Sequence, residues 1–222
     1  MNITKYRLQI GNNIVAVQCA AHLKEQAEWL LRTLKDFQFQ GKLIDDGVKE
    51  QIGWSTITLR KRGSELLVCE PDFWGDPFTN LREDITCTLT ILAKQDKLLT
   101  KLGVEAVPTT FDEKVTLAYR CLDAQRIYLE REQTKTSSDS GWYMDTPEKS
   151  FIDSGREVMY VYQLLDYRPE LLQVLSLPLG YFVAFDGNRI SSIVNIENEI
   201  VWGSIEQKID SRRERSNAIA NL

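Results

Sequence analysis

The chain has 222 residues, of which 43% are hydrophobic and 27% charged, and its formal net charge is −5. This composition is typical of a globular protein that forms one large domain or two domains of about 100 residues. No stretch of about 18 apolar residues occurs and the first residues lack the features of a signal peptide. We therefore expect no membrane span, no membrane partner and a cytoplasmic location.

The first part of the chain is expected to combine antiparallel hairpins with three helices. Alternating apolar residues on both sides of a Gly-Asn-Asn turn indicate a hairpin, and apolar residues at helical spacing follow it. The expected strands are residues 5–10, 14–19, 54–59 and 65–69. The expected helices are residues 21–40, residues 80–101, and a third that starts at Thr110 or Asp112 and continues to about Gln133.

A polar segment at residues 134–140, TKTSSDS, is the best candidate for a domain boundary. After it the pattern becomes richer in strands, at residues 157–163, 181–185 and 190–195. Pro169 should divide the intervening residues 164–175 into two short helical pieces. The predicted fold class is α+β, with an N-terminal αβ domain over residues 1–134 and a smaller, strand-rich α+β module over residues 138–222.

The negative charge is concentrated after residue 135. Residues 136–222 contain 13 acidic and 8 basic residues, which leaves 19 of each before them. Nucleic-acid binding requires clustered lysines and arginines, so this distribution argues against nucleic acid as the main ligand. It suits a basic protein partner.

Signatures of catalysis and of metal binding are missing from the sequence. His22 is the only histidine, which argues against histidine-based triads and multi-histidine metal sites, and no phosphate-binding glycine loop is present. We expect no catalytic residue, no metal and no cofactor. A hydrolase that uses carboxylates stays open as an alternative, with Asp72, Asp76, Asp145 and Glu148 as its candidates.

The cysteines are widely spaced and form no C-x-x-C pair. They are Cys19, Cys69, Cys87 and Cys121. Four cysteines allow three disulfide pairings, but we favour reduced thiols that fill small apolar sites.

Two stretches place aromatic rings among acidic residues, EPDFWGDPF at residues 70–78 and SSDSGWYMDTPEKSF at residues 137–151. In each stretch the rings either fold back onto the core or form a binding rim of the kind that carries interface hot spots. The candidate binding residues are Asp72, Trp74, Asp76, Asp139, Trp142, Tyr143, Asp145, Glu148 and Asp153.

A set of motif residues follows residue 139 in a defined order: Ser140, Gly141, Trp142, Leu164, Pro169, Leu171, Leu172, Leu175, Pro178, Gly180 and Phe185. This ordered set resembles the bacterial immunity-protein family numbered thirty-three. The resemblance implies a protein that is not an enzyme and that binds and neutralises a cognate antibacterial toxin by blocking its active site. Such toxins are often nucleases with a basic cleft, which an acidic and aromatic surface would fit. An adaptor or loading chaperone for a secreted effector is the alternative.

Overall fold

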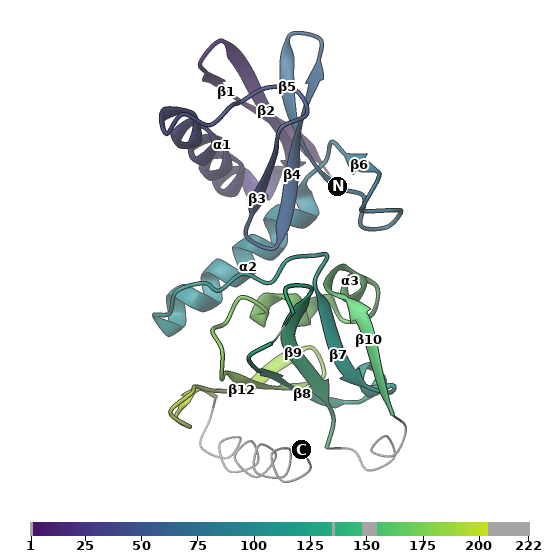
Figure 1. The fold of residues 1–222 in the computed structure, drawn as a ribbon. Helices are drawn as coiled ribbons and strands as arrows, with labels where there is room; N and C mark the ends of the chain where they lie inside the picture. The colour runs from purple at the N-terminus through teal and green to yellow at the C-terminus, as the bar shows by residue number, and fades with distance from the viewer. Residues whose placement is uncertain (1, 135, 148–154, 204–222) are drawn as a thin grey trace. The chain divides into compact units, whose positions relative to one another are not determined.

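The structure, a computed structural model, describes residues 2–134, 136–147 and 155–203. The chain divides into two compact units, Met1–Lys94 and Gln95–Leu222. Each unit has its own β-sheet, and the fold is mixed α+β with few helices, as Figure 1 shows. The predicted fold class is thus confirmed at this level. None of the helices in the described residues is long and apolar enough to cross a membrane.

The N-terminal unit contains a six-stranded sheet in the order β1-β2-β5-β4-β3, with β6 added to β5. Its strands are β1 (Ile3–Ile10), β2 (Asn13–Ala20), β3 (Lys49–Ile52), β4 (Ser55–Arg62), β5 (Glu65–Pro71) and β6 (Leu81–Arg82). Neighbouring strands are antiparallel except β2 and β5, which are parallel. The two hairpins expected from the sequence, β1-β2 and β4-β5, are confirmed.

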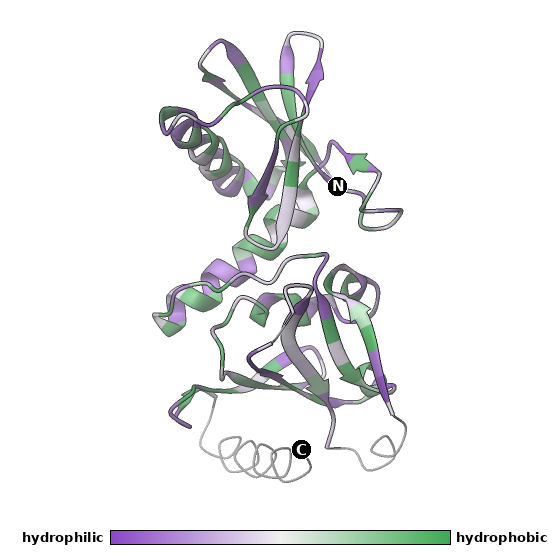
Figure 2. Cartoon of the chain, in the orientation of Figure 1, coloured by the Kyte–Doolittle hydropathy of each residue, from purple (hydrophilic) through white to green (hydrophobic). Residues whose placement is uncertain are grey.

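One face of this sheet is covered by α1 (Lys24–Phe39), which follows the short 3-10 helix η1 (Ala21–Leu23). The helix buries Ala27, Leu30, Leu31 and Leu34, which recur at helical spacing and join the cluster formed by the apolar residues of the sheet. Figure 2 shows that hydrophobic and hydrophilic residues follow one another along the strands. The predicted first helix is confirmed.

The C-terminal unit contains a seven-stranded sheet in the order β10-β7-β9-β8-β11-β12-β13. Its strands are β7 (Lys114–Ala118), β8 (Arg126–Arg131), β9 (Asp139–Asp145), β10 (Arg156–Tyr160), β11 (Phe182–Asp186), β12 (Arg189–Val194) and β13 (Ile200–Trp202). The helical pieces are η2 (Cys121–Asp123), η4 (Val161–Gln163), α3 (Leu164–Tyr167) and η5 (Pro169–Val174). Pro169 opens η5, so the predicted break of the helical segment is confirmed.

The predicted third helix is wrong. Residues 114–131 form β7, η2 and β8, and the turn between the strands contains Arg120 in the left-handed region, with φ of 60°. From Lys114 to Leu117 of β7 buried residues alternate with more exposed ones, as in a half-buried strand, and no helix of the predicted length can pass through Arg120. The second helix, α2 (Thr86–Leu102), also begins later than predicted, because the residues before it form β6.

The observed division of the chain differs from the boundary expected at residues 134–138. The polar segment connects β8 to β9, and these two strands pair with each other inside one sheet. A polar turn between hairpin strands and a linker between domains share the same composition, which explains why the sequence suggested a boundary here. The division lies instead at Lys94 and Gln95, inside the length of α2.

Candidate functional site

Trp142 lies in the core of the C-terminal unit. Its side chain is 1% exposed, and the indole N–H donates to the carbonyl oxygen of Leu175 at 3.0 Å. The Arg131 guanidinium lies 5.8 Å from the ring centroid. Of the two alternatives raised by the sequence, the structure places this ring in the core, where it offers no surface to a partner.

The two residues before Trp142 shape the strand around it. The Ser140 hydroxyl donates to the Lys114 carbonyl at 2.7 Å and accepts the Trp142 amide at 3.2 Å. Gly141 has φ of 79°, and a Cβ built on it would lie 2.2 Å from the Glu132 carbonyl oxygen. The register between β7 and β9 shifts at this point, so Gly141 belongs to an irregular turn of the strand that only glycine fits well.

Tyr143 and Asp145 lie on the opposite side of β9 and are partly exposed. The Tyr143 hydroxyl donates to Asp145 Oδ2 at 2.8 Å, while Asp145 Oδ1 accepts the Thr146 amide at 2.7 Å. Burial, followed by the hydrogen bond to Asp145, raises the pKa of Tyr143 to about 12. The Arg156 guanidinium lies 5.0 Å from the Tyr143 ring centroid. The surroundings of Tyr143 therefore contain a cation as well as the expected acid.

The other acidic candidates in this stretch differ in what can be said of them. Asp139 is partly exposed, and its Oδ1 accepts the Gly141 amide at 3.0 Å, so it supports the same irregular turn. Glu148 and Asp153 lie outside the described residues.

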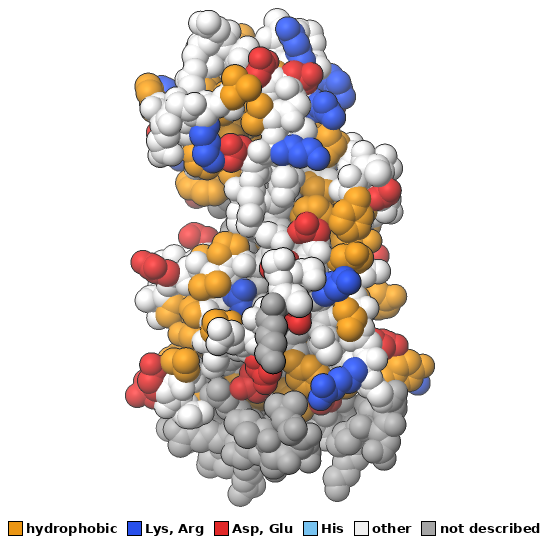
Figure 3. All heavy atoms as spheres, in the orientation of Figure 1, with side chains coloured by type: hydrophobic (Ala, Val, Ile, Leu, Met, Phe, Trp, Pro, Cys, Tyr) orange, Lys and Arg blue, Asp and Glu red, His pale blue; other side chains and the backbone are white. Residues whose placement is uncertain are grey.

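The loop after β5 in the N-terminal unit divides its aromatic residues between core and surface. Phe73 is 2% exposed and stacks on Trp54 with ring centroids 4.8 Å apart. Trp74 and Phe78 are 56% and 52% exposed. Figure 3 shows hydrophobic side chains exposed in the region of β6. A buried ring thus anchors a loop that presents two further rings to solvent.

The carboxylates of this loop are engaged within the loop or its neighbours. Asp72 forms an ion pair with Arg82 at 3.6 Å, and the Arg82 guanidinium lies 5.2 Å from the Trp74 ring centroid. Asp76 accepts the Phe78 amide at 3.0 Å and the Thr79 hydroxyl at 2.7 Å, and these hydrogen bonds, that from Thr79 first, lower the pKa of Asp76. The loop therefore presents its aromatic rings to solvent, while its carboxylates interact with neighbouring groups.

Sequence reasoning missed a buried carboxyl group, Glu70. Its side chain is 1% exposed, and Oε2 accepts the Thr88 amide in the first turn of α2 at 2.7 Å. Burial raises the pKa of Glu70 to about 8, against the opposing effect of its hydrogen bonds to Thr88. The signal was an acidic residue that directly follows the apolar run LLVC of β5.

A buried arginine was missed as well. Arg131 is 5% exposed, and one guanidinium nitrogen donates to the carbonyl oxygens of Val107 and Leu177, each at 2.6 Å. A third bond reaches the Ser140 carbonyl at 3.3 Å. Burial lowers the pKa of Arg131, and the fork of donors connects β8 to β9 and to two loops.

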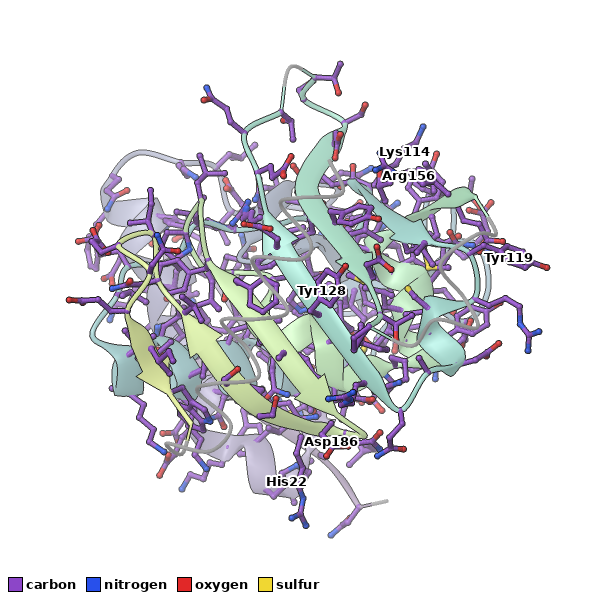
Figure 4. All side chains as sticks on the ribbon, turned by 90° about the horizontal axis from the view of Figure 1, so that it is seen from below. His22, Lys114, Tyr119, Tyr128, Arg156 and Asp186 are labelled. Atoms are coloured by element: carbon purple, nitrogen blue, oxygen red, sulfur yellow. The ribbon has the colours of Figure 1, made fainter. Side chains whose placement is uncertain are left out.

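The remaining reactive side chains are the single histidine and the four cysteines. His22 is exposed in η1, as labelled in Figure 4. Burial raises the pKa of all four cysteine thiols, and all four are free, which confirms the expectation of unpaired thiols. Within the described ranges, no three His, Cys, Asp or Glu side chains gather in a way that could hold a metal ion.

The C-terminal unit is the part of the chain for which a family is found. Residues 94–196 match the family described as Imm33-like domain. The C-terminal unit therefore carries an Imm33-like domain. The match starts at the observed boundary between the units, and it includes residues 94–138, which the resemblance read from the sequence did not reach. No curated protein and no solved structure matches the chain.

The residues that carry the resemblance to Imm33-like domains are structural. Leu164, Leu171, Leu172, Leu175 and Phe185 are at most 1% exposed. Gly180 adopts φ of 78°, and its amide donates to the Arg131 carbonyl at 2.8 Å. The match therefore reports how the domain folds and leaves the contact surface to be identified.

Proposed function

We propose that this protein is an immunity protein that binds a cognate antibacterial toxin and blocks its active site, without catalysing a reaction itself. The observation that carries the proposal is the Imm33-like domain at residues 94–196, whose family name denotes immunity proteins. The N-terminal unit, of which only residue 94 lies in that match, adds a second surface with which to hold the toxin.

The charge of the chain supports a basic partner surface. Residues 95–222 contain 20 acidic and 15 basic residues, whereas residues 1–94 contain 12 of each. A toxin with a basic active-site cleft, such as a nuclease, would be attracted by the acidic unit, because complementary charge steers association. In this proposal the C-terminal contacts are made by Asp139, Tyr143 and Asp145, together with Glu148 and Asp153.

Trp74 is the proposed anchor in the N-terminal unit. An exposed tryptophan beside an arginine has the composition of interface hot spots, and the buried Phe73 keeps its loop in place before binding. Asp72 and Asp76 flank the ring, although both also stabilise the loop. Trp142 is left out of the proposed contacts because it is buried.

The test begins with the reading frame next to this gene, because immunity genes normally sit beside their toxin genes. Its product and its isolated catalytic domain are purified and mixed with this protein. We expect the catalytic domain alone to be bound and inactivated. Binding to the full-length product with no binding to the catalytic domain would indicate an adaptor or loading chaperone instead.

A pair of tryptophan variants tests the proposed anchor. Trp74→Ala should weaken toxin binding by at least about 2 kcal/mol and leave the melting temperature unchanged, because the ring is exposed. Trp29→Ala is the matched control, since Trp29 is 45% exposed on α1, away from the loop in sequence. Equal binding by both variants would remove Trp74 from the interface.

A further inference from the structure

β10 is an edge strand of the Imm33-like domain. It pairs with β7 on one side and stands at the end of the strand order, so its other side pairs with no strand in the part of the chain that the structure describes. An open strand edge presents unpaired N–H and C=O groups, to which an extended segment of another chain can add as a further strand.

The hydrogen bonds at the two ends of β10 show which backbone groups face outward. The Tyr119 amide donates to the Gly155 carbonyl and the Val161 amide donates to the Glu113 carbonyl, both at 2.9 Å. In an antiparallel ladder the residues that exchange these bonds alternate. The odd-numbered residues of β10 therefore bond to β7, and the backbone groups of the even-numbered residues point to the open edge.

The outward-facing backbone groups belong to Arg156, Val158 and Tyr160. The Tyr160 amide is taken by the side chain of Gln163, which accepts it at 2.8 Å. The structure assigns no partner within its described residues to the amides of Arg156 and Val158. These residues lie two apart, which is the spacing at which an added strand makes its main-chain hydrogen bonds.

Side chains of β10 and the neighbouring strands combine apolar surface, aromatic rings and cations on one face, and β10 itself also carries the exposed carboxylate of Glu157. Val158 is 60% exposed. The Arg156 guanidinium lies over the Tyr143 ring, and the Lys114 ammonium lies 5.7 Å from the Tyr160 ring centroid. Figure 4 labels Lys114 and Arg156 in the same part of the sheet. Neither cation forms an ion pair with a carboxylate among the residues that the structure describes.

We propose that the β10 edge docks an extended, acidic segment of a partner protein, which adds as a strand beside Arg156 and Val158 and places carboxylates against Arg156 and Lys114. A second copy of this chain fits less well, because its own Arg156 and Lys114 would meet the same cations. This surface does not depend on the partner being a toxin. It calls for carboxylates on the partner, whereas the contact proposed above calls for cations, and the two surfaces meet at Tyr143, over whose ring the Arg156 guanidinium lies.

The test uses one pair of variants at the same position. Val158→Pro removes an amide that points outward and leaves the bonds to β7 in place, while Val158→Thr keeps both the amide and the branched shape. The probe is a random peptide library displayed on phage and selected against the purified full chain. We expect the selected peptides to alternate β-branched with acidic residues, and to bind Val158→Pro about tenfold or more weakly and Val158→Thr unchanged.

A double variant, Arg156→Glu with Lys114→Glu, tests the charge. The selected peptides should lose about tenfold or more in affinity for it, and their affinity for the unaltered chain should fall as salt rises. If Val158→Pro does not fold, the double charge variant and the salt dependence of peptide binding provide the test. The proposal is overturned if no peptide is enriched, if the enriched peptides lack acidic residues, or if folded Val158→Pro binds them fully. Self-association that Val158→Pro abolishes would assign the edge to a second copy and would overturn it too.

Discussion

Replacing Glu70 by glutamine should make the N-terminal unit more stable at alkaline pH and flatten its dependence on pH. Glu70 is buried, and its pKa is raised from 4.5 to about 8. Between these two values the folded state binds more protons than the unfolded state, so stability falls as pH rises through this window and the loss is complete above pH 8. Glutamine is uncharged and can still accept the Thr88 amide.

The expected size follows from the two pKa values. Each pKa unit corresponds to about 1.4 kcal/mol, so ionisation of Glu70 should remove roughly 3 kcal/mol of stability between pH 5 and pH 8. The free energy of unfolding of Glu70→Gln, relative to the unaltered chain, should therefore rise by about that amount over the same range.

The measurement is urea unfolding followed by tryptophan fluorescence at several pH values from 5 to 8. Trp54 reports on the site directly, because its indole N–H donates to the Thr88 carbonyl at 3.3 Å. Glu25→Gln, at an exposed position on α1, is the control and should show no such trend. A stability difference for Glu70→Gln that stays constant from pH 5 to pH 8 would refute the reasoning, since it would mean that Glu70 ionises normally in the folded state.

Three further substitutions test the packing around β9, each by denaturant unfolding. Trp142→Ala should cost about 3–5 kcal/mol, because it removes a large, fully buried side chain; a change below 1 kcal/mol would place the ring outside the core. Gly141→Ala should cost at least about 2 kcal/mol, since φ is positive and the new Cβ meets a backbone oxygen. Arg131→Met should also cost at least about 2 kcal/mol, because buried carbonyls lose their donor; unchanged stability would show that water replaces the guanidinium.

The parts of the fold that the sequence predicted well are those with strong local signals. The β1-β2 hairpin follows from alternation on both sides of a turn, and α1 follows from four apolar residues at helical spacing. The break at Pro169 follows from the covalent structure of proline itself. In each case the interactions that decide the structure lie within a few residues of one another.

The predictions that failed concern segments whose structure depends on residues far away in the sequence. Residues 114–131 contain apolar residues dense enough to suit either a buried helix or two strands, and pairing of β7 with β9 and β10 decides for strands. The alternation from Lys114 to Leu117, polar then apolar, was the local signal that favoured a strand. The unit boundary inside α2 leaves no compositional mark, because a helix is continuous through it.

Only the amino-acid composition of the candidate site was predicted from the sequence. Aromatic and acidic residues do occur together in both stretches, but the sequence could not separate Phe73 and Trp142, which are buried, from Trp74, which is exposed. Nor could it show that Asp76 and Asp145 accept hydrogen bonds from their own neighbours. The burial of a side chain and its hydrogen-bond partners depend on which elements pack together in space, and a single sequence does not give either.

The structural role of Ser140, Gly141 and Trp142 has a consequence for how the surface of the domain can vary. Successive side chains of a strand face opposite sides of the sheet, so partly exposed positions such as Tyr143 and Asp145 can be replaced while the core pattern stays intact. Two chains can thus carry equally recognisable Imm33-like domains and present different surfaces. The outer residues of the domain can in this sense be substituted, by evolution or by design, while the core residues by which the family is recognised are kept.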